Sequence, residues 1–138
     1  MPANTTPIFS RLGDVQWITS AITQNTTADL TTGTNYLVFT SDATNGGYVQ
    51  RIRFRPLGTN VATVARVWIN NGSTTGTQSN NILWDEISIA ASTASNTAAL
   101  SNYELPLNFA LPSGYKIYVT LGTTVAAGFA VTVIGGKY

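Results

Sequence analysis

Three arginines alternate along one short stretch of this chain. The segment YVQRIRFRP, residues 48 to 56, carries Arg51, Arg53 and Arg55, although the whole chain has only seven lysines and arginines. A guanidinium group presents a fork of N–H donors that fits a carboxylate or a phosphate. The spacing therefore indicates either a surface that grips anions or the solvated face of a strand.

Catalytic chemistry has few residues to work with. The chain has no His and no Cys, which excludes Ser-His-Asp and Cys-His nucleophiles, disulfides and the commonest metal ligand. Asp85 and Glu86 are neighbours and would point to opposite faces of a strand, so they do not form the facing carboxylate pair of a glycosidase. Asp42 and Asn45 in SDATNGG suit a turn better than a metal site. We expect no enzymatic activity, no cofactor and no bound metal.

Aromatic residues offer a second kind of binding chemistry. Of the three tryptophans, Trp68 and Trp84 are the best candidates for a platform on which sugar rings stack, as in carbohydrate-binding modules. Half of every sandwich strand faces the core, however, so buried aromatic packing is the simpler interpretation of the same residues.

Composition narrows the partners. Only 9% of the 138 residues are charged and the net charge is +1, so no global field draws the protein to nucleic acid or to an anionic membrane. No stretch approaches the roughly 20 apolar residues of a membrane-spanning helix, and the first residues lack the pattern of a signal peptide. We expect neither nucleic acid nor membrane as a partner.

The elements that must position these residues are β-strands. Alternation of apolar and polar residues runs throughout, and no helical stripe is longer than two turns. We predict an all-β, antiparallel two-sheet sandwich of about eight strands, resembling a jelly roll. The expected strands are residues 15–23, 35–41, 47–55, 61–70, 82–90, 102–109, 115–121 and 128–135. Residues 15–138 would form this single domain, after an extended arm of residues 1–14.

Alternation also predicts faces and register. Arg51, Arg53 and Arg55 should share one face of their strand, opposite Tyr48, Gln50, Ile52 and Phe54. A hairpin closed symmetrically about Gly76 would place Trp68 opposite Trp84 and Arg66 opposite Glu86. A bulge in that hairpin would shift the register and pair Arg66 with Asp85 instead.

The arm has apolar residues without an element of their own. Pro2 and Pro7 favour extended chain, and Ile8 and Phe9 follow them. Two interpretations stay open: the arm docks on this domain or on a neighbour, or it is a frayed terminus.

A family resemblance adds a function. The short prolyl arm, NGGYVQRIRFRPLGTNVATVARVWINNGS and LPLNFALPSGYKIYVTLGTTVAAGFAVTVIGG resemble small virion proteins of tailed bacteriophages, from about residue 35 to the C-terminus. The low charge and the abundant Thr, Asn, Gly and Ala are similar to capsid decoration (cement) proteins and to fibre modules. The resemblance implies a jelly-roll or related sandwich, often a trimer, bound to the major capsid protein or to other virion subunits.

Under this resemblance we expect a structural protein of the virion, assembled in the host cytoplasm. Its interface would be Ile8 and Phe9 of the arm together with Arg51, Arg53 and Arg55, whose counter-charges would lie on a partner subunit or a second copy. The first alternative is a tail or head fibre module that binds a host receptor or glycan. The second is a free carbohydrate-binding module that uses Trp68 and Trp84.

Overall fold

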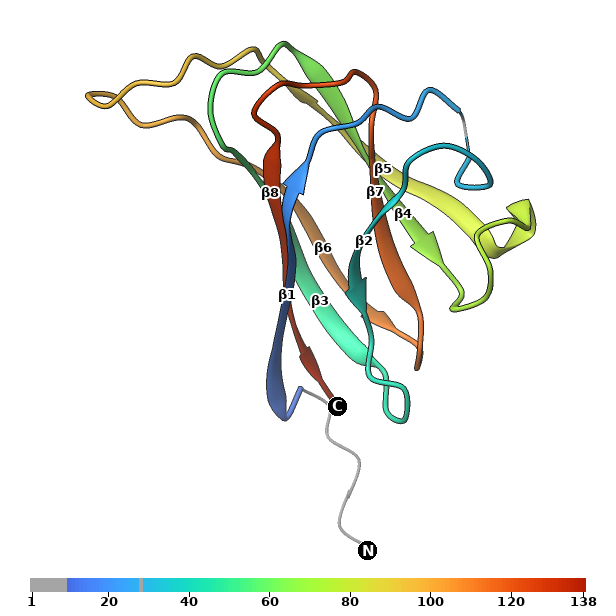
Figure 1. The fold of residues 1–138 in the computed structure, drawn as a ribbon. Helices are drawn as coiled ribbons and strands as arrows, with labels where there is room; N and C mark the ends of the chain where they lie inside the picture. Colours follow the sequence, from blue (N-terminus) through green and yellow to red (C-terminus); the bar gives the residue numbers. More distant parts are fainter. Residues whose placement is uncertain (1–9, 28) are drawn as a thin grey trace, which may run out of the picture.

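Eight strands make up the part of the chain that the structure describes, as the alternation predicts. The structure, a computed structural model, describes residues 10–27 and 29–138, and its strands pack as two layers (Figure 1). The strands are β1 (Leu12–Ala21), β2 (Tyr36–Thr40), β3 (Gly47–Pro56), β4 (Thr63–Asn70), β5 (Asn81–Ile89), β6 (Tyr103–Leu111), β7 (Lys116–Leu121) and β8 (Phe129–Lys137). Among the described residues the helical structure is a single 3-10 turn, Gln78–Asn80. None of the described segments is a helix of the length and apolar character needed to cross a bilayer.

The two layers are four-stranded antiparallel sheets. The first has the order β1-β8-β3-β6 and the second the order β2-β7-β4-β5. Only the β4–β5 connection joins neighbours within one sheet, and every other connection crosses between the sheets. This order is that of a jelly roll, so the predicted fold class is confirmed.

The core lies between the sheets and follows the period of two. In β8, Phe129, Val131 and Val133 are fully buried, while the residues between them are only partly so. Phe39 of β2 and Phe54 of β3 are the other rings that are fully buried. Each such side chain contributes roughly 1.5 to 3 kcal/mol by leaving water, which makes this layer the main stabilising term.

A bulge in β3 corrects the predicted face of that strand. Relative to β8, the pairing shifts between Val49 and Arg51, so that Gln50 is an extra residue. Val49 is therefore buried, whereas Tyr48 and Gln50 are not, and the expectation that these two share the core face with Ile52 was wrong. The alternation beyond the bulge is as predicted.

A second bulge corrects the β4–β5 hairpin. Arg66 does lie opposite Glu86, but the register then shifts and Trp68 lies opposite Leu83 rather than Trp84. Trp84 is the extra residue of β5 at this point. The bulge shifts the pairing by one residue, so the Arg66–Glu86 pair and the Trp68–Trp84 pair cannot both form. The predicted pairing of Trp68 with Trp84 was wrong.

The first strand begins earlier than the sequence indicates. β1 starts at Leu12, so residues 12–14 of the expected arm belong to the sandwich. The backbone N–H of Arg11 donates to the carbonyl oxygen of Lys137 at 2.7 Å, which places the start of β1 beside the C-terminus (Figure 1). Ile8 and Phe9 lie outside the described residues.

Candidate interaction surface

The three arginines lie on the outer face of the first sheet, in rows that cross all four strands. One row is Trp17, Thr132, Arg53 and Glu104, and the next is Val15, Ile134, Arg51 and Pro106. Residues paired directly across strands share a face, and neighbouring strands are about 4.8 Å apart. We call these eight residues and Arg55 the arginine face.

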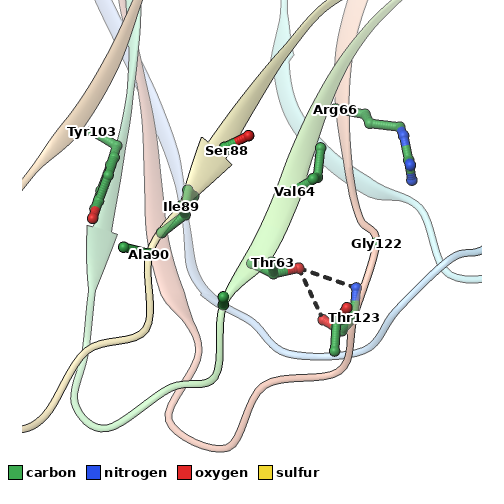
Figure 2. Close-up of a pocket in the computed structure, with 10 residues that line it drawn as sticks. Thr63, Val64, Arg66, Ser88, Ile89, Ala90, Tyr103, Gly122 and Thr123 are labelled. Atoms are coloured by element: carbon green, nitrogen blue, oxygen red, sulfur yellow. Dashed lines mark hydrogen bonds between the residues drawn. The ribbon is translucent and has the colours of Figure 1, made fainter.

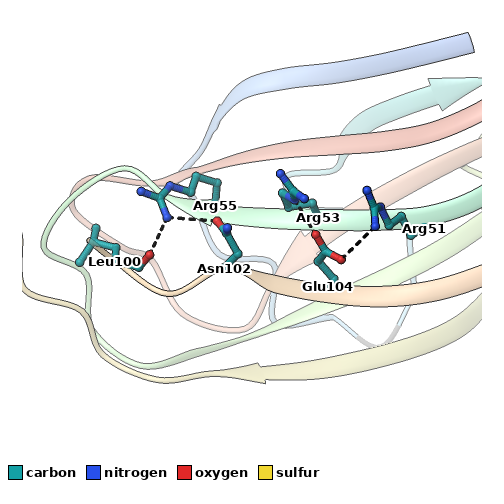
Figure 3. A network of polar contacts seen from close by, with 6 residues as sticks. All are labelled: Arg51, Arg53, Arg55, Leu100, Asn102 and Glu104. Carbon is teal, nitrogen blue, oxygen red and sulfur yellow. Dashed lines mark hydrogen bonds and ion pairs between the residues drawn. The ribbon is translucent and has the colours of Figure 1, made fainter. Parts of the chain in front are cut away.

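Two of the three guanidinium groups share one carboxylate of the same chain. Arg53 Nε donates to Glu104 Oε1 at 2.6 Å, and Arg51 Nη1 lies 3.7 Å from Glu104 Oε2. Arg55 Nη1 instead donates to the carbonyl oxygen of Leu100 at 2.6 Å and to Asn102 Oδ1 at 3.1 Å. Figure 3 shows both arrangements side by side along β3.

The charge on the arginine face does not balance. Three guanidinium groups meet one carboxylate, and the acceptors of Arg55 are neutral. The Arg53 and Glu104 side chains are 40% and 34% exposed, so both remain in reach of a partner. An ion pair this exposed typically contributes only about 0 to 1 kcal/mol to stability, which leaves the arginines available for another role.

Trp17 completes this surface and was missed at the level of sequence. Its side chain is 63% exposed, and Val15 beside it is also exposed. In the segment VQWITS, apolar Val15 and Trp17 alternate with polar Gln16. This pattern fits a strand whose Val15 and Trp17 face the core just as well as one whose Val15 and Trp17 face solvent. In the structure Asp14 and Gln16 face inward instead. No signal in the sequence distinguishes the two faces of this strand.

The inward turn of Gln16 has a visible cause. Its Nε2 donates to the carbonyl oxygen of Thr40 at 2.8 Å, and its Oε1 accepts the N–H of Thr40 at 2.9 Å. The amide thus supplies hydrogen bonds to the backbone N–H and C=O of Thr40, across the gap between the sheets where β2 has no neighbouring strand. Val15, Trp17 and Leu37 line an open groove of about 400 Å³ over this contact.

The two tryptophans of the glycan-stacking alternative are not brought together. Trp68 is only 3% exposed, and its indole Nε1 donates to Thr120 Oγ1 at 3.0 Å. Trp84 is 48% exposed and meets the ring of Phe109 edge-on, with the centroids 4.9 Å apart. A sugar could therefore reach Trp84 but not Trp68, so the pair does not form one platform.

The strand that carries Trp84 forms a second exposed surface. β5 is the last strand of its sheet and pairs only with β4. Its residues Ile82, Leu83, Trp84, Asp85 and Glu86 are all exposed, and we call them the β5 edge. Arg66 Nε lies 3.6 Å from Glu86 Oε1, whereas no ion pair of Asp85 is found among the described residues.

A further hollow is an open groove of about 630 Å³ at one end of β4 and β5 (Figure 2). Thr63 Oγ1 accepts the N–H of Thr123 there at 3.0 Å. Arg66 and the Tyr103 hydroxyl lie far apart at the two ends of the lining in Figure 2. The lining contains hydroxyls and one guanidinium but no carboxylate, so it offers no acid and base pair for catalysis.

Shifted pKa values mark turns rather than a reactive site. The N–H groups of Asn45 and Thr44 donate to Asp42 Oδ1 and lower the pKa of that carboxyl group. The hydroxyl and N–H of Thr31 lower the pKa of Asp29 in the same way. Within residues 10–27 and 29–138, no three acidic side chains gather as a metal site would require.

Comparison of the chain with models of protein families, with curated proteins and with solved structures finds no match in any of the three. The geometry of the arginine face and the β5 edge therefore carries the functional argument.

Proposed function

We propose that this chain is a structural protein of a bacteriophage virion and not an enzyme. It acts as a capsid decoration (cement) subunit that binds the assembled shell through its N-terminal arm and its arginine face. The proposal rests on the resemblance of its sequence to small virion proteins and on one structural observation. That observation is a sheet face on which exposed Val15 and Trp17 lie beside three arginines, two of which share a single carboxylate while the third has only neutral acceptors.

This surface suits a protein partner better than a small ligand. The arginine face spreads over four strands, and the groove beside Arg51, of about 390 Å³, is open rather than enclosed; it is lined by Gln50, Glu104, Pro106 and Asn108. Aromatic residues and arginines are enriched at the centres of protein interfaces. In a chain whose exposed surface is otherwise rich in hydroxyls and amides, an apolar and basic face fits an acidic virion subunit.

The mechanism is stabilisation by mass action. A subunit that binds only the assembled shell favours that state by RT ln(1 + [L]/Kd) at each site. If the subunits associate, with a trimer preferred on the resemblance, several weak contacts combine to give avidity without any single strong contact. Neither a catalytic group nor a cofactor is needed for this role.

The fibre-module and carbohydrate-binding alternatives receive less support from the aromatic residues. A sugar-stacking surface needs exposed rings beside polar groups in a groove, and Trp68 is buried. Jelly rolls occur in both capsid and lectin domains, so the fold itself favours neither function.

The deciding experiment is the location of the protein in a particle. Virions are purified by density gradient, the copy number of the chain is measured by quantitative mass spectrometry, and the particles are imaged by electron cryo-microscopy. We expect many copies at repeated positions of the shell lattice. A few copies at the tail or at fibre tips would favour the fibre alternative, and absence from all particles would overturn the proposal.

A further inference from the structure

The six carboxylates of the chain show which surface of a second copy could meet the arginine face. Glu104 already serves Arg51 and Arg53. Asp14 is buried. Asp29 and Asp42 accept hydrogen bonds within polar loops. The remaining acids, Asp85 and Glu86, lie together on the β5 edge.

The β5 edge also matches the arginine face in its apolar residues. Ile82, Leu83 and Trp84 are exposed next to the two acids, just as Val15 and Trp17 are exposed next to the arginines. Each surface thus combines exposed apolar side chains with charges of one sign, and the signs are opposite. Glu86 lies opposite Arg66, 3.6 Å from its Nε, whereas Asp85 lies opposite Val67 on the other face of the strand and its Oδ1 accepts the N–H of Glu86 at 2.7 Å. Asp85 is therefore the exposed acid of the β5 edge that has no ion pair among the described residues.

We propose that the arginine face of one copy binds the β5 edge of the next copy, head to tail. This inference rests on the proposed function and specifies a neighbouring decoration subunit as the partner of the arginine face, which leaves the arm to contact the shell protein. The arginine face looks outward from the first sheet, while the β5 edge is the free side of the second sheet. In a head-to-tail contact each pair of copies leaves one arginine face and one β5 edge unoccupied, so the assembly must close as a ring or continue as a chain.

The test uses two variants of the full chain with complementary defects. The face variant is Trp17→Ser with Arg53→Ser, and the edge variant is Ile82→Ser with Asp85→Lys. All four side chains are exposed or partly exposed, so circular dichroism and thermal melting should show both variants folded. Val61→Ser with Asn96→Lys, two exposed loop positions, serves as the matched control.

Mass is measured by sedimentation equilibrium across a wide concentration range. We expect the wild type and the control to form a closed oligomer of three or more copies. Each variant alone should have the mass of a monomer, which is 14.6 kDa for the wild-type chain. An equimolar mixture of the two variants should form a dimer and nothing larger, because one intact face meets one intact edge. The wild-type assembly should weaken in high salt, which screens exposed charges.

Three results would overturn the inference: a wild type that stays monomeric or stops at a dimer, an assembly that survives in either variant alone, or a mixture without dimers. The outcome is separable from the proposed function. A monomer that still decorates particles would contradict the ring and leave the proposed cement role intact. A ring that binds no particle would contradict the cement role and leave the ring intact.

Discussion

Arg53 is the residue at which stability and association can be separated. It lies in the middle of the arginine face, and Glu104 already satisfies its Nε at 2.6 Å. The pair is substantially exposed, so water competes with both partners in the isolated protein. At an interface that excludes water, water would no longer compete, and the interaction between Arg53 and Glu104 would be stronger.

We therefore expect Arg53→Ala to change the free energy of unfolding by less than about 1 kcal/mol. It should weaken association with a particle or with a second copy by roughly 2 to 5 kcal/mol, because it leaves an interfacial acid unpaired. Denaturant unfolding measures the first effect, and a particle-binding titration measures the second.

The matched control is Lys116→Ala, which removes a basic group from β7 in the other sheet. Both titrations should be run at low and high salt, since a pair at the rim is screened and a buried pair is not. Unchanged binding by Arg53→Ala under both conditions would leave the arginines as a solvated strand face.

The tryptophans give a second prediction at this scale. Trp68→Phe removes the donor to Thr120 Oγ1 within a buried contact, so we expect unfolding to become easier by about 1 to 3 kcal/mol. Trp84→Phe, at a half-exposed ring, should stay within about 0.5 kcal/mol of the wild type. Thermal melting of both variants decides this, and equal losses would contradict the different burial of the two rings.

At the scale of the element, the strands were predictable and their irregularities were not. The predicted bounds of β3, β4 and β5 are right to within two residues, and in β3 and β4 buried residues alternate with less buried ones along most of the strand. The bulges at Gln50 and Trp84 each add one residue that looks like any other strand residue, so the sequence carries no mark of them. The position of Arg51, Arg53 and Arg55 on one face survives because all three lie beyond the bulge.

The candidate site was accordingly predictable in part. The clustering of arginines in a charge-poor chain was visible in the sequence, whereas their partner Glu104 depends on the β3–β6 pairing. Trp17 joins the surface only because Gln16 turns inward to bind Thr40. Contacts between residues so far apart in the chain follow from the topology, which the period of two does not determine.

Glycines of neighbouring strands give a test of the β3 bulge. A methyl group at Gly135 would overlap the carbonyl oxygen of Tyr48, a backbone atom that cannot move without breaking the bulge. Gly13 has no atom near the same position. We expect Gly135→Ala to destabilise the fold by about 1 to 3 kcal/mol or more, and Gly13→Ala to be nearly neutral or stabilising. Chemical denaturation compares them, and equal stability of the two variants would argue against the close approach at Gly135.

At the scale of the whole molecule, the arm and the arginine face begin on the same sheet. β1 starts at Leu12 at the end of the molecule where β8 finishes, and Leu12 pairs with Lys137. Residues 1–9 could span at most about 30 Å if fully extended. That reach is enough to cross the width of a four-stranded sheet and contact a neighbouring subunit.

The arm can therefore be tested apart from the fold. Every strand that the structure describes starts at Leu12 or later, and we expect deletion of residues 1–9 to leave the melting temperature nearly unchanged. If the arm docks on a neighbour, the deletion should weaken particle binding at least tenfold, which corresponds to about 1.4 kcal/mol. Ile8→Ser with Phe9→Ser, which keeps the length of the arm, should reproduce most of that loss, because burial of each such side chain contributes more than roughly 1 kcal/mol.

Binding of the arm variants is measured by co-sedimentation of the purified protein with particles stripped of it. Full binding by the deletion variant would identify the arm as a frayed terminus and assign the contact with the particle to the sandwich domain. A loss in the deletion but not in the double serine variant would instead assign the contact to the backbone of the arm.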